Sequence, residues 1–425
     1  MKFLLSGDLH LGRASTRVPD DTDRAIVRAA STWNRLVEMA VDQRVRAVCL
    51  SGDIADQDNR FWESIGPLER GLRRLESEHI RVIAVAGNHD HDVLGRLADQ
   101  LDPKTFTLLG RGGQWQRITI EDEGRPALNL DGWSFPGAQV RRDPLDDYDL
   151  PPDLQAPTLG IVHGDLDARE TDYAPLDRAR LAAIPVSGWL LGHVHAPRLL
   201  AGNVGPWILY PGSPQSLDPG ETGLHGAWIT ELDAATLTVP VQLAASSVWY
   251  DRTEVDVTDL ADTPQIEAAL LEAIRGASER IADEGGAQLA HIVLRVRVTG
   301  RTAAADQIRE IAKTAISDLS LPAGAASVSV DAIDFETMPP LDLETCAGER
   351  SAPGEVARLL EALDREDGGE ELAALLRDVQ RRMEEVDGHR DFALLSRPGA
   401  PPDRARRALA RQAKTLLGQL LATSP

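Results

Sequence analysis

The sequence is short of cysteine, of long apolar runs and of positive charge, and each shortage excludes a class of protein. Its two cysteines, Cys49 and Cys346, are too few for the disulfide framework of a small secreted protein, so we expect a reducing cytoplasm. No apolar run approaches the roughly 18 residues that a membrane-spanning helix needs. The chain also reaches Asp8 and His10 too soon after its start for a signal peptide. We therefore expect a cytoplasmic protein without a membrane segment.

The shortage of positive charge bears on possible ligands. The chain has 45 Lys and Arg against 67 Asp and Glu, which gives a formal net charge of -22 at pH 7. Proteins that coat nucleic acid do so through an excess of basic side chains, so the overall charge excludes that class of binder. Any phosphate chemistry in this protein must use local positive charge.

The first half of the chain has the pattern of an α/β domain. The 425 residues predict two or three domains, at roughly 150 residues each. Short apolar runs alternate with stretches such as 25–40 and 68–75, in which apolar residues recur at helical spacing. Brief buried strands separated by helices indicate a parallel or mixed sheet. The apolar runs are Phe3–Leu5, Ala47–Leu50, Val82–Val85, Leu159–Val162 and Trp189–Leu191.

The character of the sequence changes after residue 245. Two alternating, strand-like patterns and two helical patterns follow, which predict a small α+β domain. A linker and a helical region are expected beyond it. The expected boundaries are 1–245 for the α/β domain, 246–338 for the α+β domain, 339–353 for the linker and 354–425 for the helical region.

Two features of the second half leave alternatives open. Arg295 and Arg297 share one face of an expected strand, which is either a solvated face or a contact for a phosphate backbone. Apolar residues from Leu372 to Val386 form one helical stripe. This stripe packs either on its own domain or on a partner protein.

Polar motifs follow directly after each of the five apolar runs. In open α/β sheets, ligands bind in the crevice outside the carboxyl ends of the strands. A glycine stands beside the key residue of every motif, where it permits a tight turn. The motifs therefore predict a single site at one edge of the domain. They are Asp8-Leu9-His10, Gly52-Asp53, Gly87-Asn88-His89-Asp90, His163-Gly164 and Gly192-His193-Val194-His195.

The donor atoms of these motifs indicate a metal centre. Imidazole nitrogen, carboxylate oxygen and one amide oxygen, without any thiolate, suit Mn, Fe, Zn, Co or Ni. Asp8 and His10 stand two residues apart and can reach one ion, whereas His193 and His195 can serve one ion or two neighbouring ions. Seven or eight donor groups exceed the need of one ion. We therefore expect two divalent ions about 3.5–4 Å apart, bridged by a carboxylate.

The ordered set of motifs resembles the calcineurin-like metallophosphoesterase superfamily over about residues 1–230. The resemblance implies a β-sandwich flanked by helices, and two-metal hydrolysis of a phosphoester. It also implies a role for each motif residue. Asp8, His10, Asp53 and His195 would hold one ion; Asp53 would bridge to a second ion completed by Asn88, His163 and His193; and His89 would be the general acid or orient the phosphate.

A second block narrows the resemblance. Tyr210-Pro211-Gly212-Ser213-Pro214-Gln215, followed by Asp218 and Glu221, resembles the segment after the last metal motif in SbcD-type DNA-repair nucleases, including their YhaO-like branch. The α+β domain and helical tail resemble the capping domain and ATPase-binding helices of those nucleases. The resemblance implies a Mn-dependent exonuclease and endonuclease on DNA ends, docked on the coiled-coil base of an SbcC-like SMC-type ATPase.

Other functions remain open at this level. The enzyme alternative is a phosphodiesterase or phosphatase acting on small nucleotides or phosphoproteins, with the second domain as a specificity lid. The non-enzymatic alternative is a scaffold subunit, which the full set of metal ligands disfavours. We expect Mn²⁺ before Fe, Zn, Co or Ni, and the sequence leaves the oligomeric state open, a homodimer included.

Overall fold

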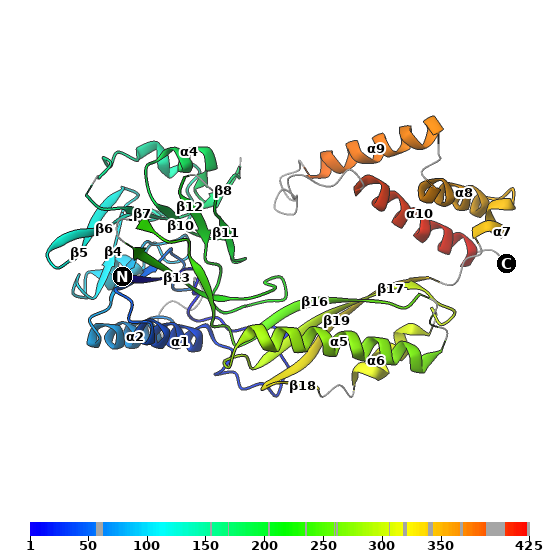
Figure 1. Cartoon of the computed structure of the whole chain (residues 1–425), viewed down its shortest axis with the longest axis horizontal. Coiled ribbons are helices and arrows are strands. Elements are labelled where there is room, and N and C mark those ends of the chain that lie inside the picture. Colours follow the sequence, from blue (N-terminus) through cyan, green and yellow to red (C-terminus); the bar gives the residue numbers. More distant parts are fainter. Residues whose placement is uncertain are drawn as a thin grey trace. The chain divides into compact units, whose positions relative to one another are not determined.

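The computed structural model divides the chain into two compact units (Figure 1). Unit 1 comprises Met1–Thr253, Ile274–Val296 and Leu319–Ala332, and unit 2 comprises Glu254–Ala273, Arg297–Asp318 and Ile333–Pro425. The structure describes residues 1–56, 63–153, 155–168, 170–202, 205–233, 236–258, 260, 262–305, 307–317, 321–338, 343–365, 369–387 and 404–422.

Two mixed sheets form the centre of unit 1. One has seven strands in the order β14-β13-β1-β2-β3-β4, with β15 paired to β13, and the other has six in the order β11-β12-β10-β7-β6-β5. The first consists of β1 (Lys2–Ser6), β2 (Ala47–Leu50), β3 (Arg81–Ala84), β4 (Phe106–Leu108), β13 (Gly226–Asp233), β14 (Thr236–Leu237) and β15 (Val241–Ala244). The second consists of β5 (Gln116–Asp122), β6 (Arg125–Trp133), β7 (Thr158–His163), β10 (Gly188–Gly192), β11 (Arg198–Leu200) and β12 (Trp207–Tyr210).

The two sheets pack face to face around an apolar core. Phe3 and Ile83 of the first sheet share one buried cluster with Leu130 and Ile161 of the second. Cys49 belongs to the same cluster, and both cysteines are free thiols. This arrangement is the predicted β-sandwich.

The strands that precede the motifs run parallel within each sheet. Leu5 of β1 is opposite Cys49 of β2, which is opposite Ile83 of β3. In the second sheet, Gly192 of β10 is opposite His163 of β7. The carboxyl ends of neighbouring parallel strands therefore lie at common edges, as the α/β prediction requires.

Helices cover the outer face of the first sheet. Helix α1 (Ala29–Asp42) and helix α2 (Ile65–Ser77) bury Trp33 and Leu68 in one cluster with Val48 and Val82 of the sheet. The expected helix over 25–40 begins only at Ala29, because the preceding segment pairs with the loop after β1 instead. The shorter elements of unit 1 are α3 (Leu94–Ala98), η1 (Pro144–Asp147), β8 (Asp165–Leu166), β9 (Pro175–Leu176) and α4 (Arg178–Ala183).

The expected α+β elements follow. A four-stranded sheet has the order β16-β17-β19-β18, and two helices are interleaved with it in sequence. Its strands contribute residues to both units, so the boundaries 246 and 338 stay a prediction. The elements are β16 (Val248–Asp256), α5 (Thr263–Gly285), β17 (His291–Arg301), α6 (Ile308–Ser317), β18 (Leu321–Ala323) and β19 (Ala326–Met338).

The two arginines on β17 are engaged in ion pairs. Arg295 contacts Asp331 through Nη2 at 2.8 Å and donates from Nε at 2.9 Å. Arg297 contacts Glu254 at 3.2 Å and pairs with Glu336 as well. Because acidic neighbours already neutralise both guanidinium groups, the structure favours a solvated, internally paired face over a free surface for phosphate.

The C-terminal region is helical, as expected, and one helix falls within the predicted linker. The helices are α7 (Leu343–Gly348), α8 (Ala352–Arg365), α9 (Gly369–Asp387) and α10 (Arg404–Ala422). Helix α7 forms inside the predicted linker 339–353 because Leu343 and Cys346 pack on a cluster with Leu360 and Leu417. Predicted linker residues 339–342 and tail residues 366–368, 388–403 and 423–425 lie outside the described residues.

None of the helices in the described part of the chain has the length and apolar character needed to cross a membrane.

The contact between β7 and β10, two neighbouring strands of the second sheet, gives a stability test. A Cβ atom on Gly160 of β7 would lie 2.2 Å from the ring of Trp189, which is fully buried. We expect Gly160→Ala to lower the free energy of unfolding by about 1–3 kcal/mol through this overlap. Urea unfolding followed by circular dichroism measures the change.

The matched control is Gly276→Ala in α5, where the added Cβ would meet nothing within 4 Å. It should leave stability unchanged or raise it by up to about 1 kcal/mol, because alanine favours helix. Equal unfolding midpoints for the two variants would contradict the packing described for β7 and β10.

Candidate metal centre

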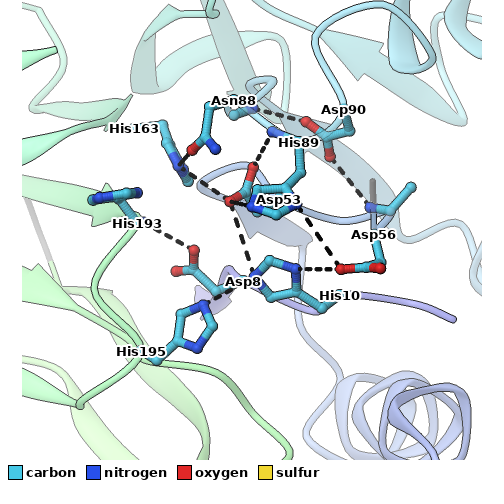
Figure 2. Close-up of polar contacts among 12 residues, drawn as sticks. Asp8, His10, Asp53, Asp56, Asn88, His89, Asp90, His163, His193 and His195 are labelled. Carbon is cyan, nitrogen blue, oxygen red and sulfur yellow. Dashed lines mark hydrogen bonds and ion pairs between the residues drawn. The ribbon is translucent and has the colours of Figure 1, made fainter. Parts of the chain in front are cut away.

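The eight residues predicted to form one site lie together between the two sheets (Figure 2). The first sheet contributes the residues that follow β1, β2 and β3, and the second contributes those at the ends of β7 and β10. Side chains from loops far apart in sequence therefore point toward one another. From the first sheet come Asp8, His10, Asp53, Asn88 and His89, and from the second come His163, His193 and His195.

Several of these residues have strained backbone. The φ angles of Asp8, His10 and Asp53 are 48°, 43° and 49°, and that of His193 is 95°. Residues other than glycine rarely adopt this left-handed region, and such strain gathers at functional sites. Backbone hydrogen bonds hold it here: the amide of Asp8 donates to Gly52 O and the amide of His10 donates to Asp53 O, both at 2.9 Å.

The motif glycines act mainly by allowing close approach. A Cβ on Gly192 would lie 2.1 Å from Ser51 O, and one on Gly87 would lie 2.2 Å from Asp53 Oδ1. Among the glycines of the motifs, only Gly52 has a positive φ, of 97°. The expectation that glycine supplies the turn therefore holds at Gly52, whereas elsewhere the missing side chain makes room for the neighbouring loop.

One group of ligand atoms consists of Asp8, His10 and His195. The Nε2 atoms of the two histidines face each other at 2.9 Å. Asp8 Oδ1 accepts a hydrogen bond from the amide of His193 at 2.9 Å. Asp8 Oδ2 is buried and has no hydrogen-bond partner among the described residues, and burial raises the pKa of this carboxyl group. A buried, unpartnered carboxylate oxygen is costly, so this group fits a divalent cation.

A second group consists of Asp53, His163 and His193. Asp53 Oδ2 lies 3.4 Å from His163 Nε2 and 3.9 Å from His10 Nε2, so it reaches both groups of ligands. The side chain of Asn88 adds an oxygen 3.0 Å from His163 Nε2. This is the arrangement that a carboxylate bridging two ions needs.

Charge within the second group is strongly coupled. Burial alone would raise the pKa of Asp53, but His163 and His10 hold it well below its ordinary value, so the carboxylate is ionised. Burial opposes the proton on His163 as well, but Asp53 raises the pKa of this imidazole to about 9. Burial and the neighbouring His163 lower the pKa of His193 to about 3. Any cation bound here must therefore displace a proton from His163.

Each of the four imidazoles in these groups directs one ring nitrogen to an oxygen atom. A hydrogen bond to this oxygen, as His163 and His195 make, fixes the orientation of the ring and turns the opposite nitrogen toward the centre. Nε2 is presented by three of the histidines and Nδ1 by His193. The pairs are His163 Nδ1 with Ser51 O at 2.9 Å, His195 Nδ1 with Glu221 Oε1 at 2.7 Å, His10 Nδ1 with Asp56 Oδ1 at 3.3 Å and His193 Nε2 with Asp165 Oδ1 at 3.4 Å.

Sequence reasoning assigned no role to the three carboxylates in these pairs. Asp56 follows Asp53 by three residues and Asp165 follows His163 by two, so proximity to a ligand was the available signal. In the sequence, Glu221 stands out only as part of the block that follows the last metal motif. It also accepts hydrogen bonds from Ser213 Oγ at 2.8 Å and the amide of Leu217 at 2.7 Å.

Asp90 has a structural role within its motif. Its carboxylate is fully buried and accepts hydrogen bonds from the amides of Gly87 at 2.8 Å and Ile54 at 2.6 Å. These contacts join the loop after β3 to the loop after β2. Asp90 therefore fixes the distance between Asn88 and Asp53.

His89 lies at the accessible edge of the centre. Its side chain is 30% exposed, and its ring meets that of His10 edge-on with centroids 4.9 Å apart. The amide of His89 donates to Asp53 Oδ1 at 2.9 Å, which ties it to the carboxylate between the two groups. The side chain can therefore meet both the centre and an incoming substrate.

The comparisons with known proteins agree with this geometry. Residues 1–197 match the calcineurin-like phosphoesterase family, and residues 249–338 match the middle domain of the metallophosphoesterase YhaO. The predicted resemblance to the calcineurin-like metallophosphoesterases, and to their YhaO-like branch, is confirmed. Residues 1–197 thus form a metallophosphoesterase domain, which is a hydrolase domain.

Individual relatives resemble the chain at low identity. It is 24% identical to the uncharacterized metallophosphoesterase YhaO of Bacillus subtilis, over 69% of this chain and 71% of that protein. It is also 24% identical to the DNA double-strand break repair protein Mre11 of Methanopyrus kandleri, over 70% of this chain and 71% of that protein. Among solved structures, a dimetal phosphatase from Danio rerio is 15% identical, with a TM-score of 0.37 over 55% of this chain and 93% of that one.

The partner of His195 gives a test of the centre. We expect Glu221→Gln to weaken Mn²⁺ binding by about 10–100-fold, because the imidazole loses the carboxylate that orients it. Calorimetric titration of the metal-free protein with Mn²⁺ measures the change. Glu231→Gln, at an exposed position of β13, is the control for the loss of one negative charge. Equal affinities in both variants would show that Glu221 does not support a metal ligand.

Proposed function

We propose that this protein is a two-metal phosphodiesterase that cuts DNA at its ends, working with a coiled-coil ATPase. The observation that carries the proposal is the convergence of seven donor side chains, the buried Asp8 and Asp53 among them, with His89 at the edge of the same centre. Similarity to the DNA double-strand break repair protein Mre11, which extends beyond the phosphoesterase domain, supports the choice of DNA over other phosphoesters.

The proposed ligand sets follow the two groups of donors. Asp8, His10 and His195 hold one ion, His163, His193 and Asn88 hold the other, and Asp53 belongs to both. When bound, two divalent ions polarise the phosphoryl oxygens and lower the pKa of water. The donors are nitrogen and oxygen atoms only, and we propose Mn²⁺ as the working ion.

The proposed role of His89 is proton transfer to the leaving oxygen, or orientation of the phosphate. Burial lowers the pKa of His89 below the ordinary value of histidine. Its Nδ1 atom lies 3.9 Å from Asp56 Oδ1, and the same carboxylate contacts His10. One carboxylate thus lies within ion-pair distance of both a proposed metal ligand and the residue that meets the substrate.

Substitution of His89 separates catalysis from metal binding. We expect His89→Ala to keep its Mn²⁺ but to lose turnover by about 10²–10⁴-fold, the usual contribution of a positioned acid or base. Metal analysis and hydrolysis of bis-p-nitrophenyl phosphate measure the two properties. Asp53→Ala should lose both metal and activity. Undiminished turnover of Mn-loaded His89→Ala would remove this residue from the mechanism.

The proposed substrate is tested by comparing hydrolysis of DNA with hydrolysis of a small phosphodiester. We expect the Mn-loaded protein to shorten end-labelled duplex DNA, because a metal-held phosphodiester is common to DNA and the small ester. The assay compares DNA with bis-p-nitrophenyl phosphate, with and without a coiled-coil ATPase of the SbcC type. Cleavage of the small ester but never of DNA would instead favour a phosphodiesterase acting on small nucleotides.

The proposed ATPase contact lies on the C-terminal helices. Leu375 of α9 is 37% exposed and Leu416 of α10 is 46% exposed, whereas Leu372 is buried. The stripe along α9 is therefore only partly covered by its own unit. We propose that these helices pack on the base of the ATPase coiled coil.

A further inference from the structure

A DNA strand that reaches the metal centre must approach a chain of net charge -22. Affinity for a phosphate backbone comes largely from Lys and Arg side chains that neutralise phosphates. Arg295 and Arg297 are already paired with acidic residues, and Arg117 of β5 is paired with Asp131. Attraction of a DNA phosphate to the centre therefore needs a nearby cation that no acidic residue has already neutralised.

Arg13 is such a cation. It follows the ligand His10 by three residues, and the loop that carries it is fixed: its amide donates to His10 O, and its carbonyl accepts from the amide of Ala29, both at 3.0 Å. Its side chain is only partly exposed and makes no hydrogen bond or ion pair with any residue that the structure describes. A guanidinium group without a protein partner keeps its N–H donors available to an external anion.

The Arg13 backbone is bonded to the ligand His10, and the charge of Arg13 acts on the neighbouring ligand His195. Burial lowers the pKa of His195, Glu221 and Asp8 raise it above its ordinary value, and the positive charge of Arg13 opposes that rise. The carboxylate that pairs with His195, Glu221, is also bound to Ser213 and the amide of Leu217. It is therefore occupied and does not serve Arg13.

A second arginine lies on the adjoining backbone segment. Ala14 and Arg28 form an antiparallel bridge, which places Arg13 and Arg28 on neighbouring backbone segments. Arg28 is exposed, and it too has no polar side-chain partner within the described parts of the chain. Residues directly opposite in such a bridge share a face and successive side chains alternate, so the Arg28 side chain lies on the face of Ala14 and the Arg13 side chain on the other. Arg13 is therefore the candidate for the phosphate, and Arg28 is a nearby charge for comparison.

We propose that Arg13 binds a backbone phosphate of DNA adjacent to the phosphate that is cut. This inference rests on the proposed function as a DNA phosphodiesterase. The metal ligands account for the scissile phosphate, and a guanidinium group matches a further phosphate through two parallel hydrogen bonds. Arg13 supplies local positive charge that the chain as a whole lacks.

The test uses the full-length, Mn-loaded protein and a duplex DNA probe. We expect Arg13→Gln to weaken DNA binding about tenfold, the usual effect of losing a charged hydrogen bond. The slope of log Kd against log salt concentration should fall by about 0.9, the contribution of one duplex phosphate contact. Arg13→Lys should keep the slope but lose part of the affinity, because an ammonium group cannot donate two parallel hydrogen bonds to one phosphate.

Three further measurements distinguish a phosphate contact by Arg13 from a general loss of positive charge or of the metal centre. Arg28→Gln removes the same charge from the neighbouring backbone segment and should lose less DNA affinity than Arg13→Gln. Arg70→Gln, an exposed arginine of α2 without a partner in the described structure, removes the same charge elsewhere and should leave the slope unchanged. Mn²⁺ content and hydrolysis of bis-p-nitrophenyl phosphate should be unchanged in all of these variants, because the small ester has no neighbouring phosphate.

Each outcome bears on one proposal. If Arg13→Gln binds DNA with the affinity and salt slope of Arg70→Gln, the inference is overturned while the nuclease proposal stands. If Arg13→Gln loses Mn²⁺ or hydrolysis of the small ester in proportion to DNA binding, Arg13 serves the centre itself, which also overturns the inference. If the unaltered protein hydrolyses the small ester but neither binds nor cuts DNA, the proposed function fails instead.

Discussion

The rest of the centre depends on the buried carboxylate of Asp53, which lies between two groups of metal-binding side chains. One of its oxygens accepts the amide of His89, and the other faces both His163 and His10. This position exists only because Gly87 has no side chain to fill it, and because Asp90 ties the loops after β2 and β3 together. Ionised and desolvated, the carboxylate attracts every cationic group around it.

Packing and electrostatics are linked through this arrangement. The face-to-face sheets bring strand ends from two layers to one edge. There a carboxylate lies next to one ring nitrogen of His195, His10 and His193, and the other nitrogen of each ring points inward. The strained φ angles at Asp8, His10 and Asp53 are maintained by hydrogen bonds between loops. Rigidity of the sandwich core therefore contributes directly to the geometry of the centre.

The structure shows which basic side chains are neutralised by acidic neighbours, whereas the sequence shows only the net charge. Many arginines are committed to ion pairs with acidic neighbours, as Arg295 and Arg297 are. Arg13, by contrast, has no acidic partner among the described residues. Under the proposed function, the placement of such cations matters more for attracting phosphate than the overall charge does.

Sequence patterns were enough to predict an α/β domain with a parallel or mixed sheet, the α+β elements, the helical tail and the eight residues that lie together at the centre, while the family resemblance implied the sandwich. They were enough because parallel strands deliver the residues that follow them to a common edge, whatever the loops between them contain. Tertiary contacts were needed to establish that α7 forms within the expected linker, that Glu221 bonds to His195 while Asp56 and Asp165 lie beside His10 and His193, and that Arg13 has no polar partner among the described residues. Those features depend on distances between side chains from separate loops, and periodicity along one chain carries no information about such distances.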